Sequence, residues 1–509
     1  MQVQQASWSE LMSGRNAALV LALSVGVTLH AINIYISTTI LPTVVADIGG
    51  LHLYAWNTTL FVVASIIGAA VSTRLLQKYG AKMAYALASA LVFIGSLLAA
   101  LAPDMSVMLI GRTLQGAGGG VLLSLGYAVV AQVFDQSLWS RAFALISGMW
   151  GMATLFGPAV GGIFAELGIW RGAFAFVLPV TLIYMLFTSW ILPGKSNIKT
   201  EQKKINLPIT QLVLLAAAVL VISIASTSPE AIWNISGVVA ALILIALLVW
   251  REKTSTTRLL PADSFKSNSC LFAILATMFL LLLAVGCEIY MPYFLQTLHG
   301  QSPLFAGYIA SLMAAGWAMS ELLSARLSGT GAQKAIIGGP IAVLIGMVAL
   351  SILVPVESSL KGDNLGLLLS VSAGLTLVGF GLGVGWPHLS TLVFQTTSGH
   401  DQEIAASAMT TVQMFAAALG AALAGMIANL TGFAQGAETT MSNTELSNTA
   451  SWLFILFALT SVPAVFSAIK VVQRSPQPEN QVLSKSSPAL SEPSQVLSES
   501  SSEVQITEQ

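Results

Sequence analysis

The chain has 509 residues, of which 55% are hydrophobic and 8% are charged, and its formal net charge is −1. Because about a quarter of the residues in a soluble domain are charged, this composition excludes a water-soluble globule and indicates a protein of the lipid bilayer. The near-zero net charge and the lack of a basic domain exclude nucleic acid as a partner.

Apolar runs of about twenty residues recur along most of the chain, and each can cross roughly 30 Å of hydrocarbon as a helix. They predict an all-α polytopic membrane protein with about 14 transmembrane helices. In chain order, the predicted spans are 17–40, 55–76, 81–102, 106–133, 143–165, 173–192, 209–226, 232–250, 270–295, 304–327, 335–354, 367–393, 405–430 and 452–472.

The basic residues predict the orientation, because lysine and arginine near span ends are retained in the cytoplasm. With both termini inside, nearly all loop lysines and arginines fall on the cytoplasmic side, and only Arg171 and Lys361 fall outside. We therefore expect a multi-pass protein of the cytoplasmic (inner) membrane with both termini in the cytoplasm.

The order of the spans predicts two six-helix bundles with a pseudo-two-fold relation, joined by two inserted helices. TRLLQKYGAK at 73–82 and ARLSGTGAQK at 325–334 support the relation, because each closes the second span of its half. The predicted parts are a cytoplasmic N-terminal segment (1–16), an N-terminal bundle (17–192), a linker with two extra transmembrane helices (193–268), a C-terminal bundle (269–473) and a disordered cytoplasmic tail (474–509).

The fourth span carries an arginine in LIGRTLQGAGGG, at 109–120. An arginine in mid-membrane costs roughly 2.5–3.5 kcal/mol, so Arg112 is expected to face the bundle interior, with Gln115 on the same helix face. The glycines that follow allow a neighbouring helix to approach closely. Alternatively, Arg112 extends to the outer interface as a structural anchor.

The fifth span contains ATLFGPAVGG, at 153–162. Pro158 cannot donate to the carbonyl of Thr154, so the helix is expected to bend there, while Gly157, Gly161 and Gly162 supply close packing. Such a bend can act as a hinge or serve packing alone.

Two acidic residues, Glu288 and Glu321, lie well inside predicted spans. Pro292 is expected to leave the Glu288 carbonyl without its helical donor, which would create a polar site for a proton or a cationic substrate. Alternatively, Glu288 is a neutral packing residue. Glu321 lies about one turn from Arg326, so an ion pair explains it as well as proton coupling does.

Other polar and aromatic residues of the spans are candidates for lining a substrate cavity. They are Asn33, Gln115, Tyr290, Trp386 and His388. Aromatic rings suit a lipophilic cation, although aromatic residues near span ends also anchor helices at the interface, and a lone membrane histidine is often structural.

The sequence predicts neither an enzyme nor a cofactor. It has no phosphate loop, no metal-ligand cluster and no nucleophile elbow. Cys270 and Cys287 lie too far apart along one helix for a disulfide and are expected to be packing residues. We expect a monomer.

Several of these segments resemble the major facilitator superfamily, in particular its fourteen-span drug:proton antiporter branch. GRTLQGAGGG resembles the family's Arg-x-x-Gln-Gly-x-Gly signature, and ATLFGPAVGG resembles Gly-x-x-x-Gly-Pro-x-x-Gly-Gly, with Ala153 in place of the first glycine. The resemblance implies proton coupling through Arg112, a hinge at Pro158 and alternating access.

The chain departs from this family at two places. Asn33 stands where many drug antiporters carry aspartate, which shifts the proton-coupling role toward Glu288. The cytoplasmic loop motif retains Lys78, Gly80 and Lys82 but lacks the family's acidic residue, so these lysines are either part of a gate or only topology signals.

The expected function is therefore export of amphipathic, cationic drugs or toxic compounds in exchange for protons. One alternative is export of a single endogenous metabolite or siderophore-like molecule. A second alternative is a lipid-handling or sensory membrane protein that kept the scaffold without transport.

Overall fold

The computed structural model describes residues 7–194, 207–255, 257–357, 365–397, 400–433 and 441–475. The predicted disordered tail lies outside the described residues from 476 onward. In chain order the elements are α1 (Trp8–Leu11), α2 (Gly14–Ile48), η1 (Leu51–Leu53), α3 (Trp56–Ala100), α4 (Met105–Ala128), α5 (Val130–Val133), η2 (Gln136–Leu138), α6 (Trp139–Glu166), α7 (Arg171–Ile191), α8 (Ile209–Ala225), α9 (Ala231–Thr254), η3 (Ala262–Phe265), α10 (Cys270–Ala284), η4 (Gly286–Tyr290), α11 (Met291–Thr297), α12 (Pro303–Ser324), α13 (Thr330–Leu353), α14 (Leu365–Thr396), α15 (His400–Ala428), η5 (Asn429–Phe433) and α16 (Asn443–Arg474).

Membrane-spanning helices dominate the part of the chain that the structure describes, where 10 helical stretches are long and apolar enough to cross a bilayer. One of these stretches contains α3, whose 45 residues would form a continuous helix about 68 Å long, more than twice the thickness of the hydrocarbon. The chain instead reverses at Gly80, whose φ of 79° favours glycine, so α3 is two spans. With α4, α8 and α12, the helices account for the predicted fourteen.

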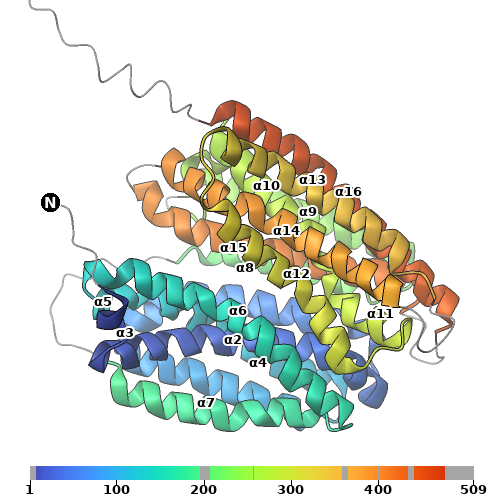
Figure 1. Ribbon diagram of the computed structural model, residues 1–509, viewed down its shortest axis with the longest axis horizontal. Coiled ribbons are helices and arrows are strands. Elements are labelled where there is room, and N and C mark those ends of the chain that lie inside the picture. The colour runs from blue at the N-terminus through green and yellow to red at the C-terminus, as the bar shows by residue number, and fades with distance from the viewer. Residues whose placement is uncertain are drawn as a thin grey trace, which may run out of the picture. The chain divides into compact units, whose positions relative to one another are not determined.

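The helix array has two end faces (Figure 1). The terminal face is the end at which α2 begins, α3 reverses at Gly80 and α16 ends. The distal face is the opposite end, where α2 ends and α7 and α12 begin. Arg171 and Asp47 form an ion pair of 2.6 Å at the distal face, which joins α2 to α7.

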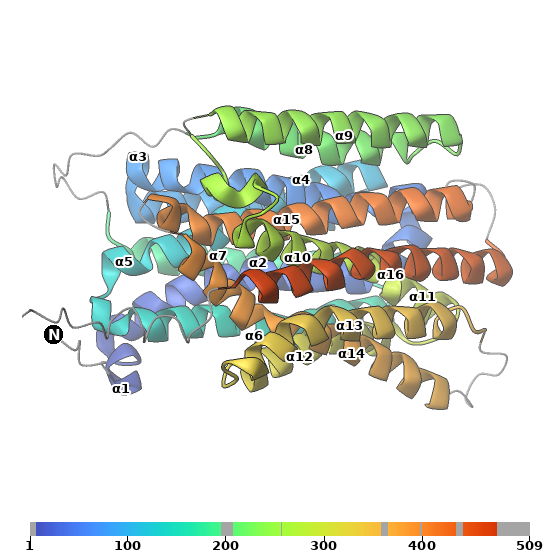
Figure 2. The same cartoon turned by 90° about the horizontal axis from the view of Figure 1, so that it is seen from above.

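The helices form two groups by their packing contacts. In the first group α2, α3, α4, α6 and α7 pack on one another, and in the second α10, α12, α13, α14, α15 and α16 do so. The hairpin of α8 and α9 covers the seam between the groups, because α8 packs on α3 of the first group and α15 of the second (Figure 2).

Glycines bring α4 into backbone contact with both halves of α3. Gly116 lies against the carbonyl of Phe61, and Gly118 lies against the carbonyl of Ala88. Gly120 also lies against Ser65 and Gly111 against Gly95, so α4 runs parallel to the first half of α3 and antiparallel to the second. This packing confirms the reversal at Gly80. The predicted close approach of helices to GAGGG is confirmed as well.

Replacing Gly116 with alanine is expected to destabilise the protein, because the new methyl group would overlap the Phe61 backbone. Overpacking of this kind costs about 1–3 kcal/mol, which thermal unfolding of the purified protein would measure. Gly151→Ala is the matched control, because nothing lies within 4 Å of the position its methyl group would take. Equal melting temperatures for the two variants would contradict the packing role of Gly116.

The two groups share one hydrophobic core toward the distal face. That core includes Ile40 and Val44 of α2 together with Met291 and Phe294 of α11 and Ile309 of the second group. Toward the terminal face, α10, α13, α14, α15 and α16 have a core of their own. The structure is therefore closed at the distal face.

Candidate functional site

Arg112 lies inside the first group, with 1% of its surface exposed. Its Nη1 donates to Gln115 Oε1 at 2.7 Å and to the Asn33 carbonyl at 3.4 Å, and its Nε donates to the Asn57 carbonyl at 3.4 Å. Gln115 in turn donates to Ser96 Oγ at 2.9 Å. This burial shows that Arg112 does not extend to an interface, in contrast to the anchor alternative.

Arg112 has no carboxylate partner among the described residues, in which the recorded ion pairs are Arg171–Asp47 and Lys266–Asp263. Its guanidinium carbon instead lies 4.2 Å from the centre of the Phe61 ring, a cation–π contact. In the described structure, backbone carbonyls, the Gln115 amide and the Phe61 ring thus contact this buried charge.

Two polar atoms of α2 lie buried near Arg112 without a hydrogen-bond partner in the described structure. They are His30 Nδ1 and Asn33 Oδ1. The His30 ring stacks on Phe61, with ring centres 5.3 Å apart, so the histidine and the arginine both contact this phenylalanine. Because buried polar atoms are rarely left unpaired, these two are candidates to bind a proton, a water or a substrate.

The glycines of α6 lie against α2 and the second group. Gly157 contacts Tyr35, Gly161 contacts Ile36, and Gly162 contacts Leu304 of α12. Tyr308 of α12 also donates to the Leu155 carbonyl at 3.1 Å, one turn from Pro158. The segment 153–162 therefore forms a distal contact between the groups.

Toward the terminal face, α6 has no close neighbour at two of its glycines. A Cβ atom on Gly148 or Gly151 would meet nothing within 4 Å, although both residues lie on the same helix as Gly162. On α12, Met319 and Leu322 are 62% and 75% exposed. The distal ends of α6 and α12 thus contact each other while the first half of α6 is open.

Glu288 lies in η4, a 3₁₀ segment between α10 and α11. The expectation that Pro292 leaves the Glu288 carbonyl without a donor is wrong, because the chain tightens to 3₁₀ geometry and the Met291 N–H bonds to that carbonyl. The polar character of this site therefore comes from the side-chain carboxylate.

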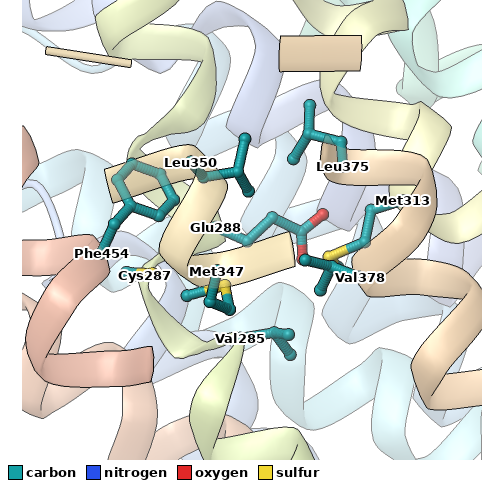
Figure 3. Close-up of a pocket in the computed structure, with 9 residues that line it drawn as sticks. All are labelled: Val285, Cys287, Glu288, Met313, Met347, Leu350, Leu375, Val378 and Phe454. Carbon is teal, nitrogen blue, oxygen red and sulfur yellow. The ribbon is translucent and has the colours of Figure 1, made fainter. Parts of the chain in front are cut away.

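The carboxylate of Glu288 points into a pocket of about 10 Å³ between helices of the second group (Figure 3). Apolar side chains and one thiol share the pocket with Glu288, namely Val285, Cys287, Met313, Met347, Leu350, Leu375, Val378 and Phe454. This volume suits about one water molecule. No hydrogen bond or ion pair of the carboxylate is recorded within the described residues.

Tyr290 does not share this pocket, because it belongs to an aromatic cluster at the distal face. Its ring stacks on Tyr54 of the first group, with ring centres 4.8 Å apart, and packs edge-on against Phe433 at 5.4 Å. Tyr293 also contacts Tyr54, at 5.5 Å. The cluster closes the distal seam between the groups.

Two amide side chains that the sequence analysis did not select also cross the distal seam. Asn429 of η5 donates to the His52 carbonyl at 2.9 Å, and Gln296 of α11 donates to the Thr39 carbonyl at 3.2 Å. Amides in otherwise apolar spans are a signal that could have identified both residues.

Trp386, His388 and Glu321 lie in the second group toward the terminal face, apart from Glu288. Trp386 packs on Trp317 with ring centres 5.3 Å apart, and His388 Nε2 is buried without a partner among the described residues. The proposed ion pair between Glu321 and Arg326 is not formed in the described structure.

Lys78, Gly80 and Lys82 lie together at the terminal face, where α3 reverses. Lys78 Nζ lies 5.0 Å from the centre of the Tyr79 ring, and the Lys82 N–H donates to the Pro193 carbonyl at 3.4 Å. The turn is thus tied to the end of α7.

Two groups of spanning helices, with ionisable side chains buried inside each group and contacts at one face, define a membrane transporter. A family model described as Major Facilitator Superfamily matches residues 23–421. The chain belongs to this superfamily.

Relatives and solved structures agree with this assignment. A protein named a probable multidrug-efflux transporter, found in Mycobacterium tuberculosis strains CDC 1551 and H37Rv, is 32% identical over 475 residues, which cover 92% of this chain and 97% of the relative. A D-xylose-proton symporter shares the fold with a TM-score of 0.61 at 14% identity, covering 91% of this chain and 99% of the symporter. A bacterial homologue of the human lysosomal transporter Spinster, in an inward-facing and unoccupied conformation, has a TM-score of 0.58 at 13% identity, with 91% and 99% covered.

Proposed function

We propose that this transporter is a proton-coupled antiporter that exports amphipathic, cationic compounds by alternating access. The observation that carries the proposal is the carboxylate of Glu288, which points into an apolar pocket inside a membrane protein. Burying an ionisable group in the membrane costs free energy, so a group in such a place indicates a function. Transport proteins use such groups to carry protons.

The size of the pocket favours a proton over a cationic substrate at Glu288. About 10 Å³ accommodates one water and excludes an amphipathic molecule. We therefore assign proton binding to Glu288 and substrate binding to other residues.

The polar cluster of the first group supports coupling. In this proposal, protonation of Glu288 neutralises the buried carboxylate and so lowers the free-energy cost of keeping it in the membrane interior. Gln115, His30 and Asn33 form the polar part of the substrate route, Arg112 takes part in proton coupling, and the glycines around Pro158 act as the hinge at which the groups separate. Glu321, Trp386 and His388 line the route toward the terminal face.

The direction of transport rests on the predicted orientation. If the terminal face is cytoplasmic, the distal closure described above is an inward-facing state that admits substrate from the cell. The relatives named as multidrug-efflux transporters support drugs as the substrate class. We further propose that the protein acts as a monomer in the inner membrane.

Proteoliposomes test this function directly. Vesicles with an acidic lumen and a neutral exterior are expected to take up a cationic dye such as ethidium, and uptake should stop when a protonophore removes the gradient. Protein-free vesicles are the control. A dye flux that ignores the gradient would contradict proton coupling.

The same vesicles distinguish a second candidate, export of one endogenous metabolite. Arg112 has no carboxylate partner in the described part of the chain, which favours this candidate, because a buried cation attracts an anionic substrate. Gradient-driven movement of an anionic metabolite without dye movement would support it, and inertness toward both would favour a non-transporting role.

A further inference from the structure

A second and larger cavity lies at the terminal face, between the start of the second half of α3 and the end of α7. It has a volume of about 310 Å³, within the range of small-molecule sites, which is roughly 300–1,000 Å³. Its lining residues are Tyr79, Lys82, Met83, Ala86, Ser189 and Gly194. We call this cavity the α3–α7 groove.

The polar mouth of the groove is positively charged. Lys82 is exposed and lines it. The segment 51–103 contains the basic residues Arg74, Lys78 and Lys82 and no acidic residue. The described end of α7 adds no negative charge, because residues 172–194 contain no acidic side chain. Gln77 stands where the family's acidic residue would lie, so Lys82 is the charged side chain among the residues that line the groove.

An apolar track leads away from the mouth toward the distal face. On α3 the track consists of Met83, Leu87 and Ile94, spaced so that they share one helix face, and on α7 of Ile183, Leu186 and Trp190. These side chains are between 41% and 79% exposed. The helices lie side by side here, since Tyr85 and Tyr184 contact each other with ring centres 6.5 Å apart.

We propose that the α3–α7 groove binds an anionic phospholipid, with its phosphate beside Lys82 and its acyl chains along the apolar track. The Ser189 hydroxyl supplies a hydrogen-bond donor at the mouth, and the Tyr79 ring suits the headgroup level of a membrane. A cationic mouth followed by an apolar track matches the two ends of one phospholipid molecule. Lipid bound there would brace the turn at Gly80 against α7.

Native mass spectrometry of the full-length, delipidated protein tests this site. Phosphatidylglycerol is expected to bind in preference to phosphatidylcholine. Lys82→Gln should weaken phosphatidylglycerol binding about fivefold, the effect of one lysine near an anionic lipid. Lys334→Gln is the matched control, because Lys334 is an exposed lysine near the start of α13, outside the groove, and the substitution should leave binding unchanged.

A steric variant separates a defined groove from general attraction to basic residues. Ala86→Trp fills the groove while all lysines remain, and it should also reduce phosphatidylglycerol binding at least as much as Lys82→Gln. Soluble glycerol phosphate should not compete. Equal binding of the two lipids, equal effects of Lys82→Gln and Lys334→Gln, full binding by Ala86→Trp, or effective competition by glycerol phosphate would each overturn the proposal.

Discussion

Replacing Glu288 with glutamine is expected to abolish proton-driven uptake of a cationic dye into proteoliposomes, down to the level of protein-free vesicles. Glutamine has nearly the same shape but cannot release or bind a proton at neutral pH. The pocket around the carboxylate is apolar and has room for about one water. Among its described lining residues, Cys287 is the other side chain with an exchangeable proton. Exchange of dye for dye, which needs no proton, should persist in this variant.

Two further variants control the Glu288 experiment. Glu288→Asp keeps a carboxyl one methylene shorter and should retain part of the proton-driven flux. Glu230→Gln removes an exposed carboxyl at the start of α9, outside both groups, and should leave the flux unchanged. Full proton-driven flux in Glu288→Gln would show that the proton is carried elsewhere, and loss of dye-for-dye exchange as well would indicate a structural role.

Replacing Gly162 with leucine is expected to open the distal face. A Cβ atom at this position overlaps the Leu304 backbone of α12, so α6 and α12 cannot approach as they do in the closed structure. Overpacking costs about 1–3 kcal/mol, and this cost falls only on the distally closed state. The balance between closed and open states should therefore shift by about 5–150-fold.

Labelling of a distal cysteine measures this shift. Thr39 is 2% exposed and contacts Gly307 across the seam, so Thr39→Cys in a Cys270→Ala, Cys287→Ala background should react slowly with a membrane-impermeant maleimide. Adding Gly162→Leu should accelerate the reaction. Gly148→Leu is the matched control, because Gly148 lies on the open half of the same helix, and it should not change the rate. Equal rates for the two variants would show that α6 and α12 do not hold the distal face closed.

The helices, the family and several local relationships could be predicted from the sequence. The apolar runs match the helices because bilayer thickness sets the length of a span, a constraint that acts on each segment separately. Arg112 and Gln115 were expected on one face because they are three residues apart on a helix, and their 2.7 Å hydrogen bond confirms it. The glycines beside them pack as predicted for the same local reason.

Other features depend on residues far apart in the chain. The carbonyls that hold Arg112 belong to Asn33 and Asn57, more than 50 residues away, and the stack of Tyr290 on Tyr54 joins the two halves. At Glu288, two local geometries were possible for the same segment. The sequence analysis expected an α-helix, in which Pro292 leaves the Glu288 carbonyl without a donor, but the chain forms a 3₁₀ turn in which the Met291 N–H bonds to that carbonyl.

By itself the sequence determined that this protein crosses the membrane many times, which helices carry buried charge and which family it belongs to, because hydrophobic run length and helical spacing are local properties. Only the tertiary structure decided that Arg112 is held by carbonyls and an amide, with no carboxylate among its described neighbours, that Glu288 faces a pocket the size of one water and that the distal face is closed. These features depend on which side chains meet when separate helices pack, and this is set by the shapes of whole helix surfaces.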